Sequence, residues 1–133
     1  MIEGILRALR LPADDVEALL PDAFVARRGG DVVGVVALER AGEQAVVRGL
    51  AVLPGARHDG VGTRLLARVL AHARELGARE AWLLTEHAER FFARRGFERA
   101  ARDGAPAPVR ASRAFASLCP EAAACMRREI LPG

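Results

Sequence analysis

The sequence contains no tyrosine and no lysine, so it has no phenol to donate a proton and no ammonium side chain to bind a phosphate. Its 2 cysteines, Cys119 and Cys125, lack C-x-x-C spacing and paired histidines, which predicts reduced thiols and argues against a disulfide framework or a zinc site. No apolar run is long enough to span a bilayer, and the charged start of the chain is not a secretion signal. We therefore expect a cytoplasmic location, no membrane partner and no metal.

The charge balance is only weakly positive. The 133 residues carry a formal net charge of +3, and the pI of about 10.0 reflects 20 arginines that are scattered over every segment. Because no dense basic tract appears, we expect no nucleic-acid partner; the alternative is a basic nucleic-acid binder, which a salt-dependent gel shift would detect. The length suits one core, so we expect a single domain covering residues 1–133.

The hydrophobic pattern predicts a mixed α/β fold with short elements. Gly29 and Gly30 permit a tight turn between two strands, and a second turn at residues 41–44 leads into a third strand, which predicts an antiparallel meander. The expected helices cover residues 5–20 with a break at Pro12, 60 or 61 to 76, and 87–95. The expected strands cover residues 24–26, 32–39, 45–53, 80–84, 97–100 and 122–130, with a long proline-bearing excursion at residues 101–120.

Residues 45–63 carry the most informative pattern, because a buried strand there runs into a glycine-bearing loop that opens a helix. The amides of Asp59, Gly60, Val61 and Gly62 are expected to lack carbonyl partners, and the helix dipole adds positive potential where they converge. This pattern predicts a site for a phosphate or pyrophosphate. Gly49, inside the preceding apolar strand, predicts a β-bulge that would free further amides.

The spacing of this loop excludes two other phosphate-binding devices. A P-loop needs a lysine where Val61 stands, and nucleotide hydrolysis is therefore not expected. The dinucleotide fingerprint needs a third glycine where Leu65 stands, and the preceding strand belongs to a hairpin series instead of a β-α-β unit. The remaining pattern is R-x-x-G-x-G at Arg57–Gly62.

That pattern follows the strand residues 50–54, and a second motif, A-x-x-F-F-x-x-x-G-F, follows at residues 88–97. Together they resemble the GNAT superfamily of N-acetyltransferases. The resemblance implies a mixed, mostly antiparallel central sheet flanked by helices, with acetyl-CoA as cosubstrate and its pantetheine arm inserted between the family's fourth and fifth strands. The cofactor-binding residues that it implies are Leu50, Ala51, Val52, Arg57, His58, Asp59, Gly60, Val61, Gly62, Thr63, Phe91 and Phe92.

The family usually begins with a strand, and residues 1–5 are too short to supply a full one. The first strand is therefore expected to be short or missing, to be borrowed through a dimer, or to survive as a remnant at residues 2–5. An open sheet edge also favours a homodimer, because unpaired backbone groups attract a partner.

The resemblance implies that the backbone around Leu50 binds the oxyanion of the reaction, and we single out Glu86 as the base. Phe92 stands where family members commonly have a tyrosine acid, so another group or water protonates the thiolate, or the chain is a non-catalytic CoA-binding regulatory module. Other candidate bases are Glu39, Glu43, His58 and His87, and Cys119 is the weakest candidate, as a covalent acetyl carrier.

The segments 83–85, 108–112 and 115–120 resemble acetyltransferase-like proteins associated with bacterial arsenic-resistance operons. By position, Arg110, Ser112 and Ser117 are candidates to line the acceptor pocket, where an arginine would suit a carboxylate or another oxyanion. We therefore expect acetyl transfer to the amine of a small molecule, linked to arsenic or another toxic compound.

Overall fold

The computed structural model describes residues 22–57, 59–118 and 123–130, and of residues 117 and 118 only the backbone. The helices expected between residues 5 and 20, the short first strand, His58 and Cys119 lie outside the described residues. Six strands form one sheet in the order β1-β2-β3-β4-β6-β5. Since β3 and β4 are parallel whereas β1–β2, β4–β6 and β5–β6 are antiparallel, the predicted mixed, mostly antiparallel sheet is confirmed.

The described residues fall into two compact units, the first containing residues 22–38 and 47–72 and the second residues 39–46 and 73–130. Strands β2 and β3 contribute to both. The elements are β1 (Ala23–Arg28), β2 (Asp31–Ala41), β3 (Gln44–Val52), η2 (Pro54–Ala56), α3 (Val61–Glu75), β4 (Glu80–Thr85), α4 (Glu89–Ala93), β5 (Glu98–Arg99), η3 (Arg102–Gly104), α5 (Ala107–Arg110), η4 (Ala114–Leu118) and β6 (Ala124–Glu129).

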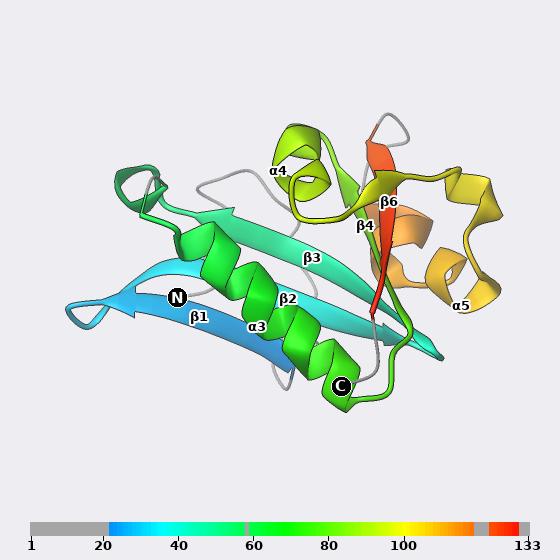
Figure 1. The fold of residues 1–133 in the computed structure, drawn as a ribbon, viewed down its shortest axis with the longest axis horizontal. Coiled ribbons are helices and arrows are strands. Elements are labelled where there is room, and N and C mark those ends of the chain that lie inside the picture. The colour runs from blue at the N-terminus through cyan, green and yellow to red at the C-terminus, as the bar shows by residue number, and fades with distance from the viewer. Residues whose placement is uncertain (1–21, 58, 119–122, 131–133) are drawn as a thin grey trace. The chain divides into compact units, whose positions relative to one another are not determined.

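In the first unit, α3 lies along one face of β1, β2 and β3 (Figure 1). The apolar residues that recur at three- and four-residue steps on one side of the helix are buried, as expected for a helix with one face on a sheet: Val61, Leu65, Leu66, Val69 and Ala73. Gly34 of β2 lets the helix approach closely, because a Cβ there would lie 2.9 Å from Leu65 Cδ1 and 3.1 Å from Val61 Cγ1. The unit therefore holds the start of α3 firmly against the sheet.

The turns of both units follow the glycines. Gly29 and Gly30 adopt φ angles of +59° and +93° in the β1–β2 turn, as predicted for a tight hairpin. Gly77, with φ +86°, ends α3. Its amide donates to the backbone carbonyl of Arg74 at 3.0 Å, and the amide of Ala78 donates to the backbone carbonyl of Ala73 at 3.0 Å. The predicted boundaries of this helix are therefore confirmed to within one residue.

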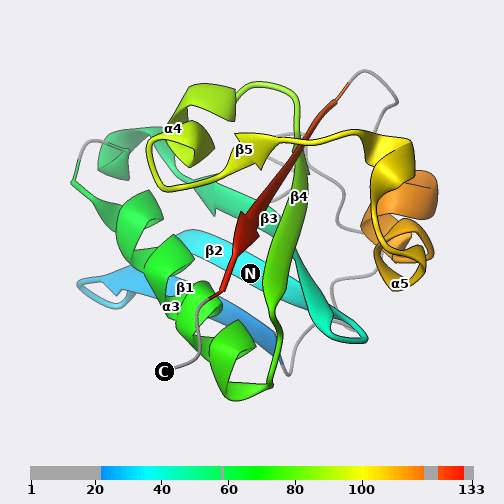
Figure 2. The ribbon, with the colours of Figure 1, turned by 45° about the vertical axis from the view of Figure 1, so that its right-hand side comes forward.

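In the second unit, β6 lies between β4 and β5, with α5 and η4 grouped to one side (Figure 2). Trp82 belongs to the core there, together with buried residues from the excursion after β5 such as Val109 and Phe115. The helix expected at 87–95 is shorter, because Thr85 Oγ1 accepts the amide of Ala88 at 3.0 Å and holds the intervening residues in a turn. The last two strands are also shorter than predicted.

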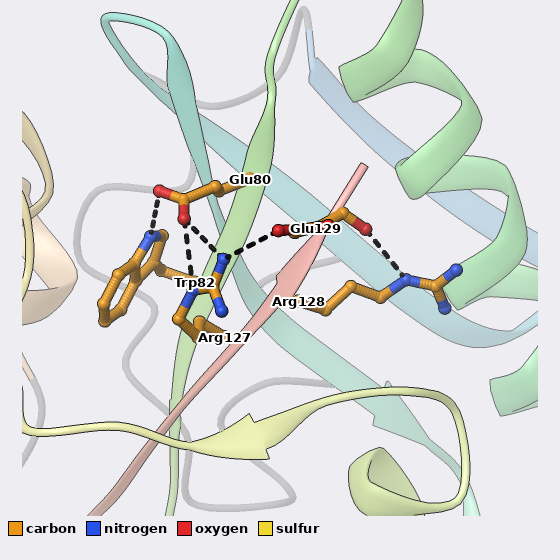
Figure 3. Close-up of polar contacts among 5 residues, drawn as sticks. All are labelled: Glu80, Trp82, Arg127, Arg128 and Glu129. Atoms are coloured by element: carbon orange, nitrogen blue, oxygen red, sulfur yellow. Dashed lines mark hydrogen bonds and ion pairs between the residues drawn. The ribbon is translucent and has the colours of Figure 1, made fainter. Parts of the chain in front are cut away.

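A polar cluster on β4 and β6 completes this core (Figure 3). Glu80 accepts hydrogen bonds from Trp82 Nε1 at 3.3 Å and from Arg127 Nε and Nη2 at 3.1 and 2.6 Å. Arg127 also lies 4.0 Å from Glu129, whose side chain is 72% exposed. Because a buried indole N–H needs an acceptor, the cluster allows Trp82 to pack in the core without an unmet donor.

Candidate functional site

The loop between β3 and α3 is built from a series of short turns in the first unit. The amide of Leu53 donates to Val33 at 2.8 Å and fixes the end of β3, and the amide of Ala56 donates to Leu53 at 2.9 Å within η2. Pro54 is the first residue of η2, where its fixed φ suits the turn and its missing N–H is not needed. The sheet therefore anchors the loop that leads to the helix.

Gly60 is the N-cap of α3. Its carbonyl accepts the first hydrogen bond of the helix, from the amide of Arg64 at 3.1 Å, and its φ of +75° is one that favours glycine. Within the described part of the chain, no backbone carbonyl accepts the amides of Gly60 and Val61. These donors, with the helix dipole behind them, form an anion-binding geometry.

One expected donor is corrected by the structure. The amide of Asp59 donates to the carbonyl of Ala56 at 3.3 Å, because the loop makes another turn immediately before the helix begins. An anion bound at this helix start would therefore meet amides from Gly60 onward. Thr63, also on the first turn, has a polar interaction of its own.

Three exposed guanidinium groups belong to the same loop region. Arg57 Nε donates to the carbonyl of Val52 at 3.1 Å, and Arg64 Nη1 donates to the carbonyl of Asp59 at 3.2 Å. Arg28, at the end of β1, forms an ion pair with the carboxylate of Asp59. The R-x-x-G-x-G motif does not predict the contact with Arg28, which is 31 residues from Asp59 in the chain.

The parallel ladder between β3 and β4 is short. It consists of three pairs, Gln44 with Glu80, Ala45 with Ala81 and Val46 with Trp82, whereas β3 runs on to Val52. Gly49 in this continuation has φ +66°, the left-handed conformation that a bulge glycine adopts. The ladder to β4 therefore uses none of the backbone groups of Leu50, Ala51 and Val52.

The candidate bases occupy different environments. Glu86 and His87 are exposed in the turn after β4, and Glu43 is exposed in the β2–β3 turn. Glu39 accepts backbone amides from Arg113 at 2.7 Å and Ala114 at 3.4 Å, which places its carboxylate at the start of η4. Glu39 therefore stabilises a helix end, a role that its sequence position did not indicate.

The two phenylalanines of the second motif also differ. Phe92 is 5% exposed and packs edge-on against Phe91 and Phe97, with ring centroids 5.1 and 5.5 Å apart. The Phe91 ring is covered by the guanidinium of Arg95 at 3.7 Å. Phe92 is therefore a core residue, and the aromatic contacts explain why a ring is found there.

The polar residues expected at an acceptor pocket are engaged in local structure. Ser112 is buried; its Oγ donates to Val109 at 2.6 Å and accepts the amide of Phe115 at 3.3 Å, joining α5 to η4. Arg110 Nε donates to the carbonyl of Ala105 at 3.0 Å. The side chain of Ser117 lies outside the described residues. The expectation for Ser112 is therefore wrong, because its hydroxyl is already used at a helix junction.

The described residues include one cysteine, Cys125. Cys125 is a free, buried cysteine, and desolvation raises the pKa of its thiol. Among the residues that the structure describes, no group of three or more His, Cys, Asp or Glu side chains could hold a metal ion. Within the same residues, no helix has the length and apolar character needed to cross a membrane.

The sequence of this chain is similar to known acetyltransferases. Residues 21–99 match the family model described as an acetyltransferase (GNAT) domain. An amino-acid acetyltransferase of Neisseria meningitidis is 31% identical over 106 residues, a match that covers 78% of this chain and 24% of that protein. The chain thus spans about a quarter of the length of this curated relative.

Solved structures agree with the family match at the level of the fold. N-acetylglutamate synthase from Neisseria gonorrhoeae, complexed with coenzyme A and N-acetyl-glutamate, aligns with a TM-score of 0.84 at 24% identity, covering 98% of this chain and 32% of that chain. An aminoglycoside 6′-N-acetyltransferase complexed with coenzyme A aligns with a TM-score of 0.75 at 17% identity, covering 99% and 90%. With the family model matching more than half of its residues, this chain belongs to the acetyltransferase (GNAT) domain family.

Proposed function

We propose that this chain binds acetyl-CoA through residues 57–63 and transfers the acetyl group to the amine of a small molecule. The observation that carries the proposal is the start of α3, where the amides of Gly60 and Val61 lack backbone acceptors among the described residues. Anions are stabilised at such helix ends by direct hydrogen bonds and by the dipole. The diphosphate of CoA has the charge and the oxygen atoms for this geometry.

The residues around the loop fit this ligand. The guanidiniums of Arg57 and Arg64 are exposed and are oriented by backbone carbonyls of the loop, so they are available for bidentate bonds to phosphate. A side chain at position 60 would combine a strained backbone with a Cβ 3.5 Å from Arg64 Nη1. The glycine therefore keeps the approach to the amides open. We further propose that Ala51, Val52, Phe91 and Phe92 contribute to the path of the pantetheine arm.

We propose a direct transfer. The neutral acceptor amine attacks the acetyl carbonyl carbon, a C–N bond forms, and the C–S bond to CoA breaks. Glu86, exposed after β4, takes the proton from the attacking nitrogen, and a backbone amide at Leu50 donates to the oxyanion. Water protonates the departing thiolate, because the chain contains no tyrosine.

A non-catalytic CoA-binding module is the second candidate. The observation that favours it is Phe92, a buried ring in the position where the resemblance leads one to expect a phenol acid. A CoA thiolate is a fair leaving group near neutral pH, and loss of a general acid costs about 10²-fold, so catalysis remains our first proposal.

Two measurements on the full chain test the proposal. We expect calorimetry to show saturable binding of acetyl-CoA, and we expect amine-dependent release of free thiol from a panel of amino acids and aminoglycosides. Each acceptor is matched with its N-acetylated form, which should release no thiol above background. Binding without thiol release would favour the module, and absence of binding would contradict both proposals.

The substitution Glu86→Gln tests the proposed base. We expect kcat/KM to fall by about 10²-fold or more at neutral pH, with partial recovery as the pH rises and more amine becomes neutral. The matched control is Glu43→Gln, in the exposed β2–β3 turn, for which we expect kcat/KM close to that of the wild type. Equal values for both variants would remove Glu86 from the mechanism.

Amino acids come first on the panel because a relative of this chain is an amino-acid acetyltransferase. The link to arsenic or another toxic compound stays a prediction, as do the single domain over residues 1–133, the cytoplasmic location and the homodimer. A growth assay with arsenite in a strain lacking the protein tests the link to arsenic.

A further inference from the structure

The carboxylate of Asp59 lies at a place where it opposes the proposed ligand. Asp59 directly precedes the N-cap Gly60, where the positive end of the helix dipole attracts a carboxylate. It therefore competes with a phosphate for the same positive potential and also repels the phosphate through its charge. An acid there needs compensation if the loop is to hold an anion.

Arg28 supplies that compensation in the structure. Its guanidinium, carried by the β1–β2 hairpin, forms an ion pair with the Asp59 carboxylate, and both side chains are about half exposed at 50% and 52%. Within the described residues, neither the Gly60 amide nor the Val61 amide donates to this carboxylate. The pair therefore cancels one negative charge beside the start of the helix.

We propose that Arg28 is a positioning residue for CoA binding, which holds the Asp59 carboxylate off the start of α3 and neutralises it. This inference rests on the proposed function, because it concerns the same phosphate site. An exposed ion pair contributes little to folding stability, so its effect should appear in ligand affinity. Removing Arg28 frees a competing anion, whereas removing the charge of Asp59 leaves a guanidinium free to attract phosphate.

The experiment is a double-mutant cycle measured by acetyl-CoA calorimetry at about 0.05 M salt, where charge effects are weakly screened. We expect Arg28→Ala to weaken binding by about tenfold and Asp59→Asn to tighten it by about threefold, since the local charge changes by one unit in opposite directions. The double variant should bind within about twofold of the wild type. Urea unfolding of each variant checks that the fold is intact.

The matched control is Arg27→Ala, which removes the same charge from the neighbouring residue, whose Nη1 donates to the carbonyl of Gly30 at 3.5 Å in its own hairpin. We expect its affinity to change by less than about twofold. Raising the salt to about 0.5 M should reduce the Arg28→Ala defect to about threefold or less, which a purely structural defect would not do.

The outcomes separate the two proposals. If the wild type fails to bind acetyl-CoA, the proposed function is wrong. If the wild type binds but Arg28→Ala binds equally well, or if Asp59→Asn does not rescue it, the role of Arg28 is wrong while the proposed function stands.

Discussion

The loop before α3 and the excursion after β5 are both rich in polar groups, but they use them in opposite ways. In the loop, the guanidiniums of Arg57 and Arg64 are exposed and the amides of Gly60 and Val61 lack backbone acceptors among the described residues. In the excursion, the Ser112 hydroxyl is buried and bonded on both sides. One region leaves its guanidinium groups exposed, and the other uses its polar groups to hold short helices together.

This difference indicates which substitutions should affect binding and which should affect folding. A change in the loop removes few packing contacts but alters the field and the hydrogen bonds that an anion meets. A change among the engaged polar groups of the second unit leaves buried partners unsatisfied. Substitutions in the two regions should therefore have separable effects on ligand affinity and on unfolding.

The substitution Gly60→Glu should weaken acetyl-CoA binding by about 100-fold or more, because it combines a strained positive φ with a negative charge at the amides. Calorimetry measures the affinity. The matched control is Gly55→Glu in the same loop, where a Cβ meets no atom within 4 Å, and the loss there should be much smaller. Equal losses would show that the added charge alone determines the loss of affinity. No loss of affinity in either variant would place the ligand elsewhere.

The substitution Glu80→Gln should lower the free energy of unfolding by about 2 kcal/mol, since it removes the charge from a carboxylate that Arg127 and the Trp82 indole share. Urea denaturation measures the change. Glu129→Gln is its control, because that side chain is 72% exposed and 4.0 Å from Arg127, and it should cost less than about 0.5 kcal/mol. Acetyl-CoA affinity should change in neither variant.

The substitution Glu39→Gln should cost about 1 kcal/mol of stability, because Arg113 and Ala114 donate to different oxygens of the carboxylate and a glutamine keeps only one oxygen, without charge. Thermal unfolding against Glu43→Gln isolates this contribution. A fall in kcat/KM of about 100-fold with unchanged stability would instead identify Glu39 as a catalytic base and would break the comparison between the two regions.

The alkaline stability of the protein should reflect Cys125. Because the pKa of the Cys125 thiol is raised in the folded protein, the unfolded chain loses this proton at a lower pH than the folded protein does. The contribution of the protonated thiol to stability is therefore present below the ordinary pKa of 9.0 and is lost as the pH rises above it. The absence of lysine and tyrosine leaves this pH range clear of other side-chain titrations except Cys119. Unfolding of Cys125→Ala in a Cys119→Ala background should lack the decline.

The sequence was informative where the backbone determines the structure. Gly29 and Gly30 predicted a turn that the structure contains, and the hydrophobic pattern predicted α3 to within one residue. The strand, the loop and the helix start at residues 52–61 were also predictable, whereas phosphate binding by the loop stays a prediction. Such features depend on local conformation, which a short stretch of sequence encodes.

The sequence was less informative where a side chain has several possible partners. The sequence around Ser112 does not indicate that its hydroxyl bonds at a helix junction. The sequence around Glu39 does not indicate that this residue of β2 bonds to the start of η4, because such contacts depend on the tertiary fold. The pairing of Arg28 with Asp59 has the same origin, since it joins a hairpin to a loop 31 residues away. Secondary-structure propensity and residue spacing carry no information on contacts between side chains that are far apart in the sequence.

Among the described residues, the basic side chains around the loop before α3 are the guanidiniums of Arg28, Arg57 and Arg64. A lysine in any of these places would, when neutral, be a nucleophilic amine held beside a reactive acetyl thioester, and its acylation would erase the charge. Arginine stays protonated and does not undergo this reaction under such conditions. If the loop holds acetyl-CoA as proposed, its positive charge is protected from chemical damage by its own ligand.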